Sequence, residues 1–323
     1  MTSPVRVFAP ASVSNLGPGF DVLGLAVERP GDVVEAECSS GPGLEILEIT
    51  GDGGQLSRDA ARNVAGVAAA SVLAALRARG LATPPVLPGV RLRVHKQMPL
   101  ASGLGSSAAS SVAGAMAVNE LFGAPLSKHE LLPHALAGER AAAGFGHADN
   151  AAPCLLGGIV LIRGYEPLDV LQLPVPPALR VVVVHPHARV ETSRARALLR
   201  GYGFPIEQAV ANLGNLGAFV AALYRNDLEL LGRAVEDRMV EPLRTPLIPG
   251  YLEVKQAASR AGALGCSISG SGPSVFALAA DDGTAETVAG AMRRAFLDAA
   301  GLDSEAYIGP VNAAGAKRVA RCA

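Results

Sequence analysis

Residues 99–110 read PLASGLGSSAAS, in which two glycines and several serines stand directly before an alanine-rich segment. Glycines let the backbone approach a ligand closely, and the N–H groups at the start of a helix, together with the helix dipole, attract an anion. The hydroxyls of Ser106 and Ser107 add contacts for phosphate or for a magnesium ion. The stretch therefore predicts a phosphate-binding loop, and the simpler alternative is a tight turn that caps a buried helix.

Two common phosphate-binding motifs compete for the same residues. Residues 103–108, GLGSSA, fit the loose GxGxxA pattern of dinucleotide-binding proteins, which also requires an acidic residue after a second strand about 20 positions later. Glu120 has that spacing but lies inside a helical stretch, which disfavours this interpretation. The nucleotide loop GxxxxGK[ST] requires a lysine, and none follows Gly105, so that interpretation fails.

Two further glycine-rich segments occur far away in the chain, GPG at residues 17–19 and SGSGP at residues 269–273. One such turn is common in proteins and needs no functional explanation. Three of them predict a site that is lined by backbone from distant parts of the sequence.

Strands and helices must position these segments. Alternating or apolar runs predict strands over residues 5–9, 32–38, 91–95, 157–162, 181–185 and 275–279. Helical patterns predict helices over residues 63–79, 106–122 and 131–143, with more helix within 190–240. We expect Pro10 to end the first strand and residues 147–150, HADN, to lie in a loop.

The proline-rich segment 167–177 is the best candidate for a domain boundary. Strands and helices alternate without a repeated βαβ spacing, which favours layers of helix and sheet in two domains over a doubly wound sheet. A length of 323 residues also suggests two domains.

The composition excludes several classes of function. The 28 lysines and arginines nearly balance the 29 aspartates and glutamates, so no global charge favours nucleic acid or an anionic membrane. The four cysteines lie far apart without a CxxC pair, which disfavours a zinc site or a disulfide framework. Because no apolar stretch is typical of a signal or a bilayer span, we expect a cytoplasmic protein.

Three motifs together resemble the GHMP kinases. PLASGLGSSAAS is similar to their central phosphate loop, APASVSNLGPGFDVLG to their first motif, and SISGSGPSVFAL to their third. Within that superfamily, HADNAAPCLLGG and EPLRTPLIPGY are similar to the homoserine kinase branch. The resemblance implies an α+β fold of two domains, with a ribosomal protein S5 domain 2-like unit over residues 1–166 and a ferredoxin-like unit over residues 167–323. It also implies ATP between the domains and a homodimer.

The resemblance implies an ATP site and a magnesium site. Ser107 and Glu139 match the family's magnesium ligands, and hard oxygen donors of this kind suit an ion that keeps several waters. Lys96, just ahead of the loop, is the candidate cation near the phosphates, with a surface lysine at a strand end as the alternative. The expected ATP-binding residues are Asn63, Lys96, Pro99, Leu100, Ala101, Ser102, Gly103, Leu104, Gly105, Ser106 and Ser107.

The implied substrate is L-homoserine, phosphorylated on its side-chain hydroxyl in threonine biosynthesis. Asp21 has the charge to bind an ammonium, and two arginines around one carboxylate suit bidentate recognition. Asn150 and Arg196 are expected to take part in catalysis. The expected substrate-binding residues are Asn15, Asp21, His147, Asn150, Arg196, Arg244 and Gly270.

The source of a general base is left open by the residues. Several relatives use an aspartate assisted by a lysine of the first motif, and Ser12 stands in place of that lysine here. One hypothesis is that no strong base acts and that Asn150 orients the hydroxyl, because an amide is no base near neutral pH. The alternative is that Asp149 accepts the proton.

Three other functions are weighed against this one. A kinase of another small alcohol, such as mevalonate, would share the arginines, but the acidic Asp21 favours a substrate with an ammonium. A non-catalytic binding module is expected to have lost the glycine loop or the carboxylate at Glu139, and both are present. The third is a dinucleotide-dependent dehydrogenase, which is disfavoured because the sequence shows no second strand at the position that its motif requires.

Overall fold

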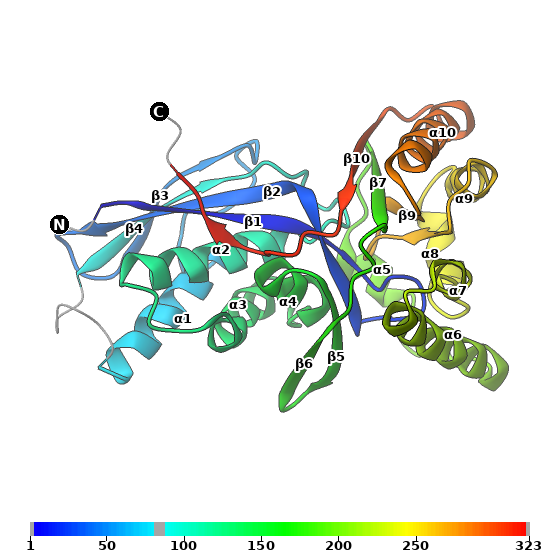
Figure 1. Ribbon diagram of the computed structural model, residues 1–323. Coiled ribbons are helices and arrows are strands. Elements are labelled where there is room, and N and C mark those ends of the chain that lie inside the picture. The colour runs from blue at the N-terminus through cyan, green and yellow to red at the C-terminus, as the bar shows by residue number, and fades with distance from the viewer. Residues whose placement is uncertain (1–2, 81–87, 321–323) are drawn as a thin grey trace.

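The computed structural model describes residues 3–80 and 88–320, so Cys322 lies outside the described residues. Strands and helices form two units side by side, each with its own sheet (Figure 1). The α+β class predicted from the sequence is confirmed. No helix in the described ranges is long and apolar enough to cross a membrane.

The first unit is built on a seven-stranded sheet in the order β11-β1-β2-β4-β3, with β5 paired to β2 and β6 paired to β5. Helices pack against one face of this sheet (Figure 1). The strands are β1 (Val5–Ser14), β2 (Leu23–Ser39), β3 (Leu44–Thr50), β4 (Gly89–His95), β5 (Ile159–Tyr165), β6 (Leu168–Leu173) and β11 (Lys317–Arg318). The helices are α1 (Val64–Ala78), α2 (Ser106–Leu121), α3 (Lys128–Ala143) and α4 (Ala148–Leu156).

The second unit is built on a four-stranded sheet in the order β10-β7-β9-β8, against which α9 and α10 pack. Its strands are β7 (Arg180–Pro186), β8 (Gly265–Ile268), β9 (Val275–Ala279) and β10 (Ser304–Pro310). Its helices are α5 (Thr192–Ala197), α6 (Ile206–Arg225), α7 (Leu228–Ala234), α8 (Glu241–Arg244), the 3-10 turn η1 (Thr245–Leu247), α9 (Tyr251–Arg260) and α10 (Asp282–Ala300).

Helix α2 is the central element of the first unit and carries the glycine loop at its start. Nearly all of its residues are buried, which is possible because the helix is made largely of alanine, serine and valine. At Gly114 a β-carbon would lie 2.5 Å from the Ala65 carbonyl oxygen of α1, so the two helices touch through their backbones. This packing fixes the start of α2, and hence the loop, within the fold.

Two local predictions are wrong, and both errors concern residues of the site. Strand β1 does not end at Pro10 but continues to Ser14, because a register shift between Pro10 and Ser12 accommodates the proline. HADN does not lie in a loop, because α4 begins at Ala148, with His147 as its N-terminal flanking residue.

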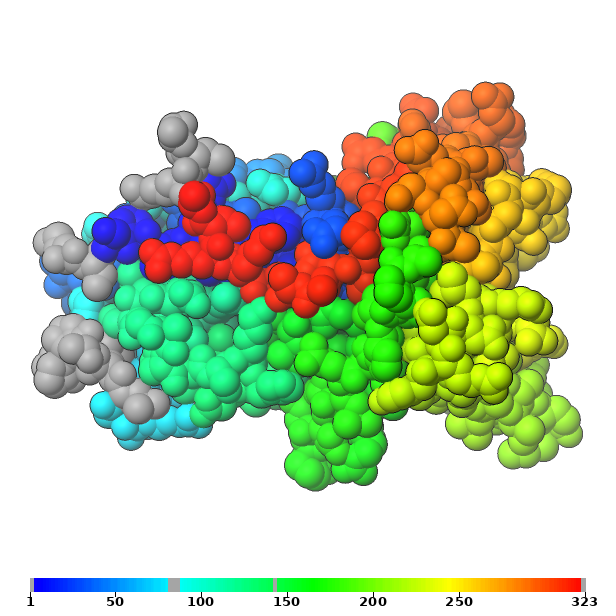
Figure 2. Space-filling model, viewed as in Figure 1, coloured from blue at the N-terminus to red at the C-terminus, as the bar shows by residue number. Residues whose placement is uncertain are grey.

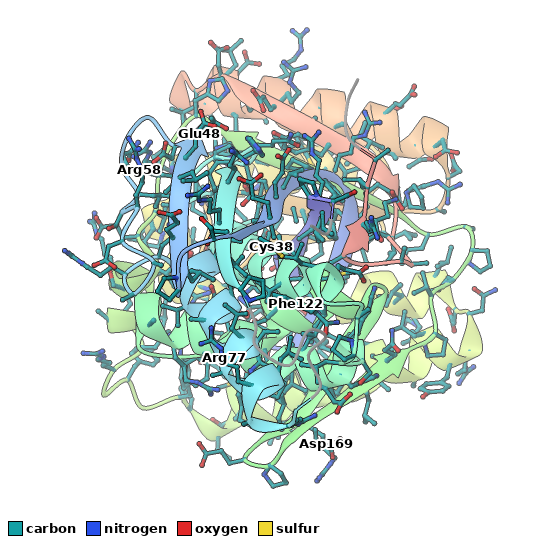
Figure 3. The ribbon with its side chains drawn as sticks, turned by 90° about the vertical axis from the view of Figure 1, so that its left-hand side faces the viewer. Cys38, Glu48, Arg58, Arg77, Phe122 and Asp169 are labelled. Carbon is teal, nitrogen blue, oxygen red and sulfur yellow. The ribbon has the colours of Figure 1, made fainter. Side chains whose placement is uncertain are left out.

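The chain crosses between the units later than residue 166, because β6 occupies part of the proline-rich segment and pairs with β5. This hairpin projects from the body of the molecule, and Asp169 marks its outer part (Figure 3). The C-terminal segment then returns to the first unit, where β11 pairs with β1. Figure 2 shows this segment, in red, lying across the first unit. The expected domain boundary between residues 166 and 167 therefore lies at the turn of the β5–β6 hairpin, inside the first sheet.

Candidate active site

A cavity of about 320 Å³ is lined by the glycine loop, by Gly270 and Ser271 of the third glycine-rich segment, and by Asn15 and Asp21, which flank residues 17–19. All but two of the residues expected from the sequence to bind ATP, metal or substrate line it. The exceptions are Leu104, whose side chain is fully buried in the core, and Pro99, which lines a neighbouring cavity. The residues shared by prediction and cavity are Asn15, Asp21, Asn63, Lys96, Leu100, Ala101, Ser102, Gly103, Gly105, Ser106, Ser107, Glu139, His147, Asn150, Arg196, Arg244 and Gly270.

The glycine loop is held in a conformation that leaves the start of α2 open. Gly103 and Gly105 have positive φ values of 79° and 67°, which favour glycine. Gly105 precedes the first turn of α2, and no side chain caps the helix there. The N–H groups of that turn therefore need another hydrogen-bond acceptor, which suits a phosphate.

Replacing Gly105 by alanine is expected to lower kcat by about 10²-fold, the scale of an ångström-sized displacement of reacting groups. A β-carbon at this position would lie 2.2 Å from Ser12 Oγ and 2.8 Å from Asn150 Oδ1. Steady-state kinetics would measure the effect. Gly123→Ala is the matched control, because Gly123 has a φ of 88° and no atom within 4 Å of its β-carbon position. Equal losses of activity in both variants would contradict the steric explanation.

The third glycine-rich segment clamps the loop from the second unit. Ser269 Oγ donates a hydrogen bond to the Gly103 carbonyl oxygen at 2.7 Å, and Ser274 Oγ donates to the Ser102 carbonyl oxygen at the same distance. From the other side, the Ser12 backbone N–H donates to the Leu104 carbonyl oxygen at 3.0 Å. The sequence identified this segment as a turn, but the contacts of its serines depend on tertiary structure.

Lys96 lies beneath the loop, in a buried ion pair. Its Nζ contacts the Asp32 carboxylate, and the lysine and aspartate side chains are 1% and 0% exposed. The ammonium also donates to Ser106 O at 2.9 Å, Ser106 Oγ at 2.7 Å and Ser110 Oγ at 2.8 Å. The positive charge is thus compensated by Asp32, and its hydrogen bonds hold the first turn of α2. Sequence reasoning missed Asp32, because the alternating pattern of residues 32–38 predicts a half-exposed strand whose acidic side chains face solvent.

This pair predicts a difference between single and double variants. Lys96→Met is expected to lower the free energy of unfolding by about 3–5 kcal/mol, because it leaves the Asp32 carboxylate buried without its cation. Lys96→Met with Asp32→Asn is expected to recover most of that loss, since neither buried charge is left unpaired. Urea denaturation would measure both.

The folded double variant also tests whether Lys96 contacts ATP. If the ammonium only supports the loop, the KM for ATP is expected to stay within about threefold of the wild-type value. A much larger KM in a variant of normal stability would instead assign the charge to the phosphates.

Asn63 caps α1 at the edge of the cavity. Its Oδ1 accepts hydrogen bonds from the N–H groups of Ala65 and Gly66, and its Nδ2 donates to the Ser57 carbonyl oxygen at 2.9 Å. Asn63 therefore orders the segment around Ser57, which also lines the cavity. The expected nucleoside contact remains a prediction.

Ser107 and Glu139 provide oxygen donors that fit a magnesium ion. Glu139 is buried, its Oε2 lies 3.3 Å from His147 Nδ1, and its Oε1 has no hydrogen-bond partner in the described structure. Ser107 is exposed at the start of α2. Within the described ranges no group of three or more His, Cys, Asp and Glu side chains forms a metal cluster. One carboxylate and one hydroxyl suit an ion whose remaining ligands are water and phosphate oxygens.

Opposite charges meet in another part of the same cavity. Arg196 binds both carboxylate oxygens of Asp21, with Nη1–Oδ2 and Nη2–Oδ1 distances of 3.0 and 2.9 Å. The guanidinium carbon lies 5.6 Å from the centroid of the Phe20 ring and 5.0 Å from that of Phe145. The aromatic rings and the ion pair together fix the direction of the guanidinium.

Arg244 and Asn15 meet at the carbonyl oxygen of Gly270. Arg244 Nη1 donates to it at 2.7 Å and Asn15 Nδ2 at 3.0 Å, while Asn15 Oδ1 accepts from the Asp21 N–H. Burial lowers the pKa of Arg244 to about 10, and its Nε has no partner among the described residues. The arginine therefore has a buried N–H available for an anion.

Asn150 is held between two serines of β1. Ser12 Oγ donates to Asn150 Oδ1 at 2.9 Å, and Asn150 Nδ2 donates to Ser14 Oγ at 3.1 Å. The first turn of α4 thus presents this amide to the cavity in one orientation. The neighbouring His147 has an unpartnered Nε2 within the described structure. Burial opposes its charged form, but Glu139 and Asp149 outweigh this and raise its pKa.

Asp149 is fully buried, and its Oδ1 has no hydrogen-bond partner in the part of the chain that the structure describes. Burial, followed by the nearby negative charge of Asp21, raises its pKa to about 7. The folded state therefore binds this proton more tightly than the unfolded chain does. The stabilisation that the protonated carboxyl provides is present below pH of about 4 and is lost as the pH rises to about 7.

Asp149→Asn mimics the protonated carboxyl and removes this pH dependence. The melting temperature of the variant is expected to exceed that of the wild type above pH of about 7 and to match it near pH 4. Calorimetry over this pH range would measure the difference. A constant difference at all pH values would contradict the raised pKa.

The cavity combines a helix start that can bind an anion, oxygen donors for a cation, and charged side chains of both signs. Models of two known domains match the chain, described as GHMP kinases N terminal domain over residues 64–158 and GHMP kinases C terminal over residues 219–298. A curated homoserine kinase of Chlorobium phaeobacteroides is 46% identical over 97% of this chain and 98% of its own.

Solved structures are similar to the whole chain. A homoserine kinase from Cytophaga hutchinsonii is 48% identical, with a TM-score of 0.93 over 99% of this chain and 98% of its own. An L. major mevalonate kinase in complex with R-mevalonate is 19% identical, with a TM-score of 0.70 over 97% of this chain and 100% of its own. The second likeness shows the fold alone.

Proposed function

The chain belongs to the GHMP kinase family, and we propose that it transfers the γ-phosphoryl group of ATP to the side-chain hydroxyl of L-homoserine, which yields O-phospho-L-homoserine for threonine biosynthesis. The resemblance and the two-domain fold predicted from the sequence are confirmed by this full-length similarity. The observation that carries the choice of substrate is the meeting of Asp21 with Arg196 and Arg244 in the cavity that also holds the glycine loop.

ATP binds with its phosphates on the glycine loop. The open N–H groups at the start of α2 donate hydrogen bonds to the phosphate oxygens, and the buried ion pair of Lys96 and Asp32 supports that turn from below. Ser107 and Glu139 hold a magnesium ion, which when bound neutralises charge on the phosphate oxygens.

Homoserine binds as a zwitterion. Its ammonium takes the place of the Arg196 guanidinium beside Asp21, while its carboxylate binds Arg196 and the available Nε–H of Arg244. One ion pair within the protein, Asp21–Arg196, is thus replaced by two ion pairs between the protein and the substrate. A hydroxy acid without an ammonium, such as mevalonate, would leave Asp21 paired with Arg196, and only its carboxylate would form charged contacts.

The reacting hydroxyl lies at Asn150, close to the imidazole of His147. The hydroxyl oxygen attacks the γ-phosphorus, the bond to the oxygen that bridges the β- and γ-phosphates breaks, and ADP leaves. Asn150, fixed by Ser12 and Ser14, orients the hydroxyl, and the proton leaves late to phosphate or water. Phosphoryl transfer depends mainly on positioning and charge, so this arrangement requires no strong base.

The experiment that tests the proposal is a coupled assay of ADP release with four alcohols: L-homoserine, mevalonate, galactose and shikimate. We expect turnover that depends on homoserine, ATP and magnesium and that stops when a chelator removes the metal. No release of ADP with homoserine would refute the proposal, and turnover with mevalonate alone would favour the other branch of the family.

The family resemblance also leads us to propose a homodimer in the cytoplasm.

A further inference from the structure

Tyr165 is the last residue of β5, in the hairpin that projects from the first unit (Figure 1). It is not part of the cavity lining, and it lies outside the motifs found in the sequence. Its partly buried side chain nevertheless contacts two residues beside the substrate site, Asp21 through the hydroxyl and Phe145 through the ring.

The hydroxyl of Tyr165 holds the backbone of Asp21. It donates a hydrogen bond to the Asp21 carbonyl oxygen at 2.7 Å, while the Asp21 N–H donates to Asn15 Oδ1 at 3.1 Å. Asp21 has a φ of 59°, in the left-handed region, which costs free energy for a residue other than glycine. Two hydrogen bonds, one on each side of the α-carbon, therefore keep Asp21 in this conformation and fix the direction of its carboxylate.

Strand register brings the phenol to this carbonyl group. β5 pairs with the start of β2 in antiparallel order, and the Ile162 N–H donates to the Val22 carbonyl oxygen at 2.8 Å. In antiparallel strands the residues that follow Ile162 lie beside those that precede Val22. Tyr165 and Asp21 are such residues, so the pairing of the two strands determines their contact.

The ring of Tyr165 supports the other member of the ion pair. Its centroid lies 5.2 Å from that of Phe145, and the Phe145 centroid lies 5.0 Å from the guanidinium carbon of Arg196. A ring that is packed against a second ring presents its face to a cation in one orientation. Tyr165 therefore acts on Asp21 through its hydroxyl and on Arg196 through Phe145.

The phenol keeps its proton near neutral pH. Burial, followed by the negative charges of Asp149 and Asp21, raises the pKa of Tyr165 above its ordinary value of 10.0. The hydroxyl is therefore a constant hydrogen-bond donor. Because it also lies outside the cavity lining, it affects the substrate by positioning other groups and not by transferring a proton.

We propose that Tyr165 is a positioning residue for the amino-acid end of the substrate: its hydroxyl orients Asp21 for the ammonium, and its ring, through Phe145, orients Arg196 for the carboxylate. This inference rests on the proposed function and assigns part of the selectivity for an amino acid to a side chain that lies behind the site. These contacts do not involve the glycine loop, so binding of ATP is expected to be independent of Tyr165.

Tyr165→Phe removes the hydroxyl and keeps the ring. Kinetics with L-homoserine, and inhibition by 4-hydroxybutanoate, which lacks only the amino group, separate the ammonium from the rest of the substrate. We expect the KM for homoserine to rise about tenfold, while kcat, the KM for ATP and the Ki of 4-hydroxybutanoate stay within about twofold. An unchanged KM for homoserine, or equal increases in this KM and in the Ki, would overturn the proposal.

Two further variants complete the comparison. Tyr165→Leu also removes the ring and is expected to raise the Ki of 4-hydroxybutanoate about tenfold, because Arg196 binds the carboxylate that both molecules share. A Ki equal to that of the wild type would contradict the role of the ring. Tyr307→Phe is the matched control: it removes a hydroxyl that donates to Glu305 Oε2 at 2.6 Å on β10, and no constant is expected to change.

Hydrogen exchange without substrate separates failure of this proposal from failure of the proposed function. The Asp21 N–H is expected to exchange about fivefold faster in Tyr165→Phe than in the wild type, whichever alcohol the protein phosphorylates. Unchanged exchange would overturn the proposal. Turnover of homoserine is measured on the wild type alone, so its absence would refute the proposed function independently of the exchange result.

Discussion

Asn150→Ala is expected to lower kcat by about 10³-fold while changing the KM for ATP little, because positioning of the reacting hydroxyl is the main contribution that this residue makes. The amide is held from both sides by hydroxyls of β1, at 2.9 Å from Ser12 and 3.1 Å from Ser14. A side chain fixed in this way loses little entropy when it binds the hydroxyl, and alanine offers no polar atom in its place. Steady-state kinetics with homoserine would measure both constants.

Asp149→Asn is the matched comparison, since the two residues are adjacent on the first turn of α4. If no strong base acts, this variant is expected to retain kcat to within about tenfold. A loss of about 10⁴-fold in kcat for Asp149→Asn alone is the size expected on removal of a general base. It would contradict the hypothesis that Asn150 and late proton loss suffice.

Arg196→Ala is expected to lower kcat/KM for homoserine by about 10³-fold, because it removes a bidentate partner of the substrate carboxylate from a partly desolvated site. The same substitution leaves Asp21 without the cation that it binds in the structure. Arg194→Ala is the matched control, since Arg194 lies on the same short helix but is exposed. Equal effects of the two substitutions would argue against a direct role for Arg196.

Arg196→Lys separates geometry from charge. Lysine keeps the positive charge but cannot bind a carboxylate with two parallel hydrogen bonds, so we expect it to recover only a small part of the lost activity. Full recovery would mean that charge alone suffices at this position.

The site could be predicted from the sequence as far as its parts are consecutive in the chain. The glycine loop, its position before a helix, and the first and third motifs were each recognisable from residue types and order. The structure brings these segments to one cavity. The side chain of Leu104 is the exception, because it is buried in the core while its carbonyl oxygen accepts a hydrogen bond from the Ser12 N–H. A motif predicts which segment approaches a ligand, but not which of its atoms do so.

The pairing of distant side chains could not be predicted. Lys96 was expected near the phosphates, and only the fold shows that Asp32, 64 residues earlier, neutralises it inside the protein. Likewise β1 runs past Pro10, because a shift in register accommodates a residue that normally ends a strand. That continuation carries Ser12 and Ser14 to Asn150. Such contacts depend on strand register and packing, which single residues do not encode.

The central claim is that this cavity phosphorylates an amino-acid hydroxyl, and a competition experiment tests it most directly. Wild-type protein would receive ATP, magnesium and equal amounts of L-homoserine and mevalonate, and ³¹P NMR would identify the phosphorylated product. The account predicts O-phospho-L-homoserine as the product, formed in step with ADP. Formation of phosphomevalonate, or ADP release without any phosphorylated alcohol, would contradict it.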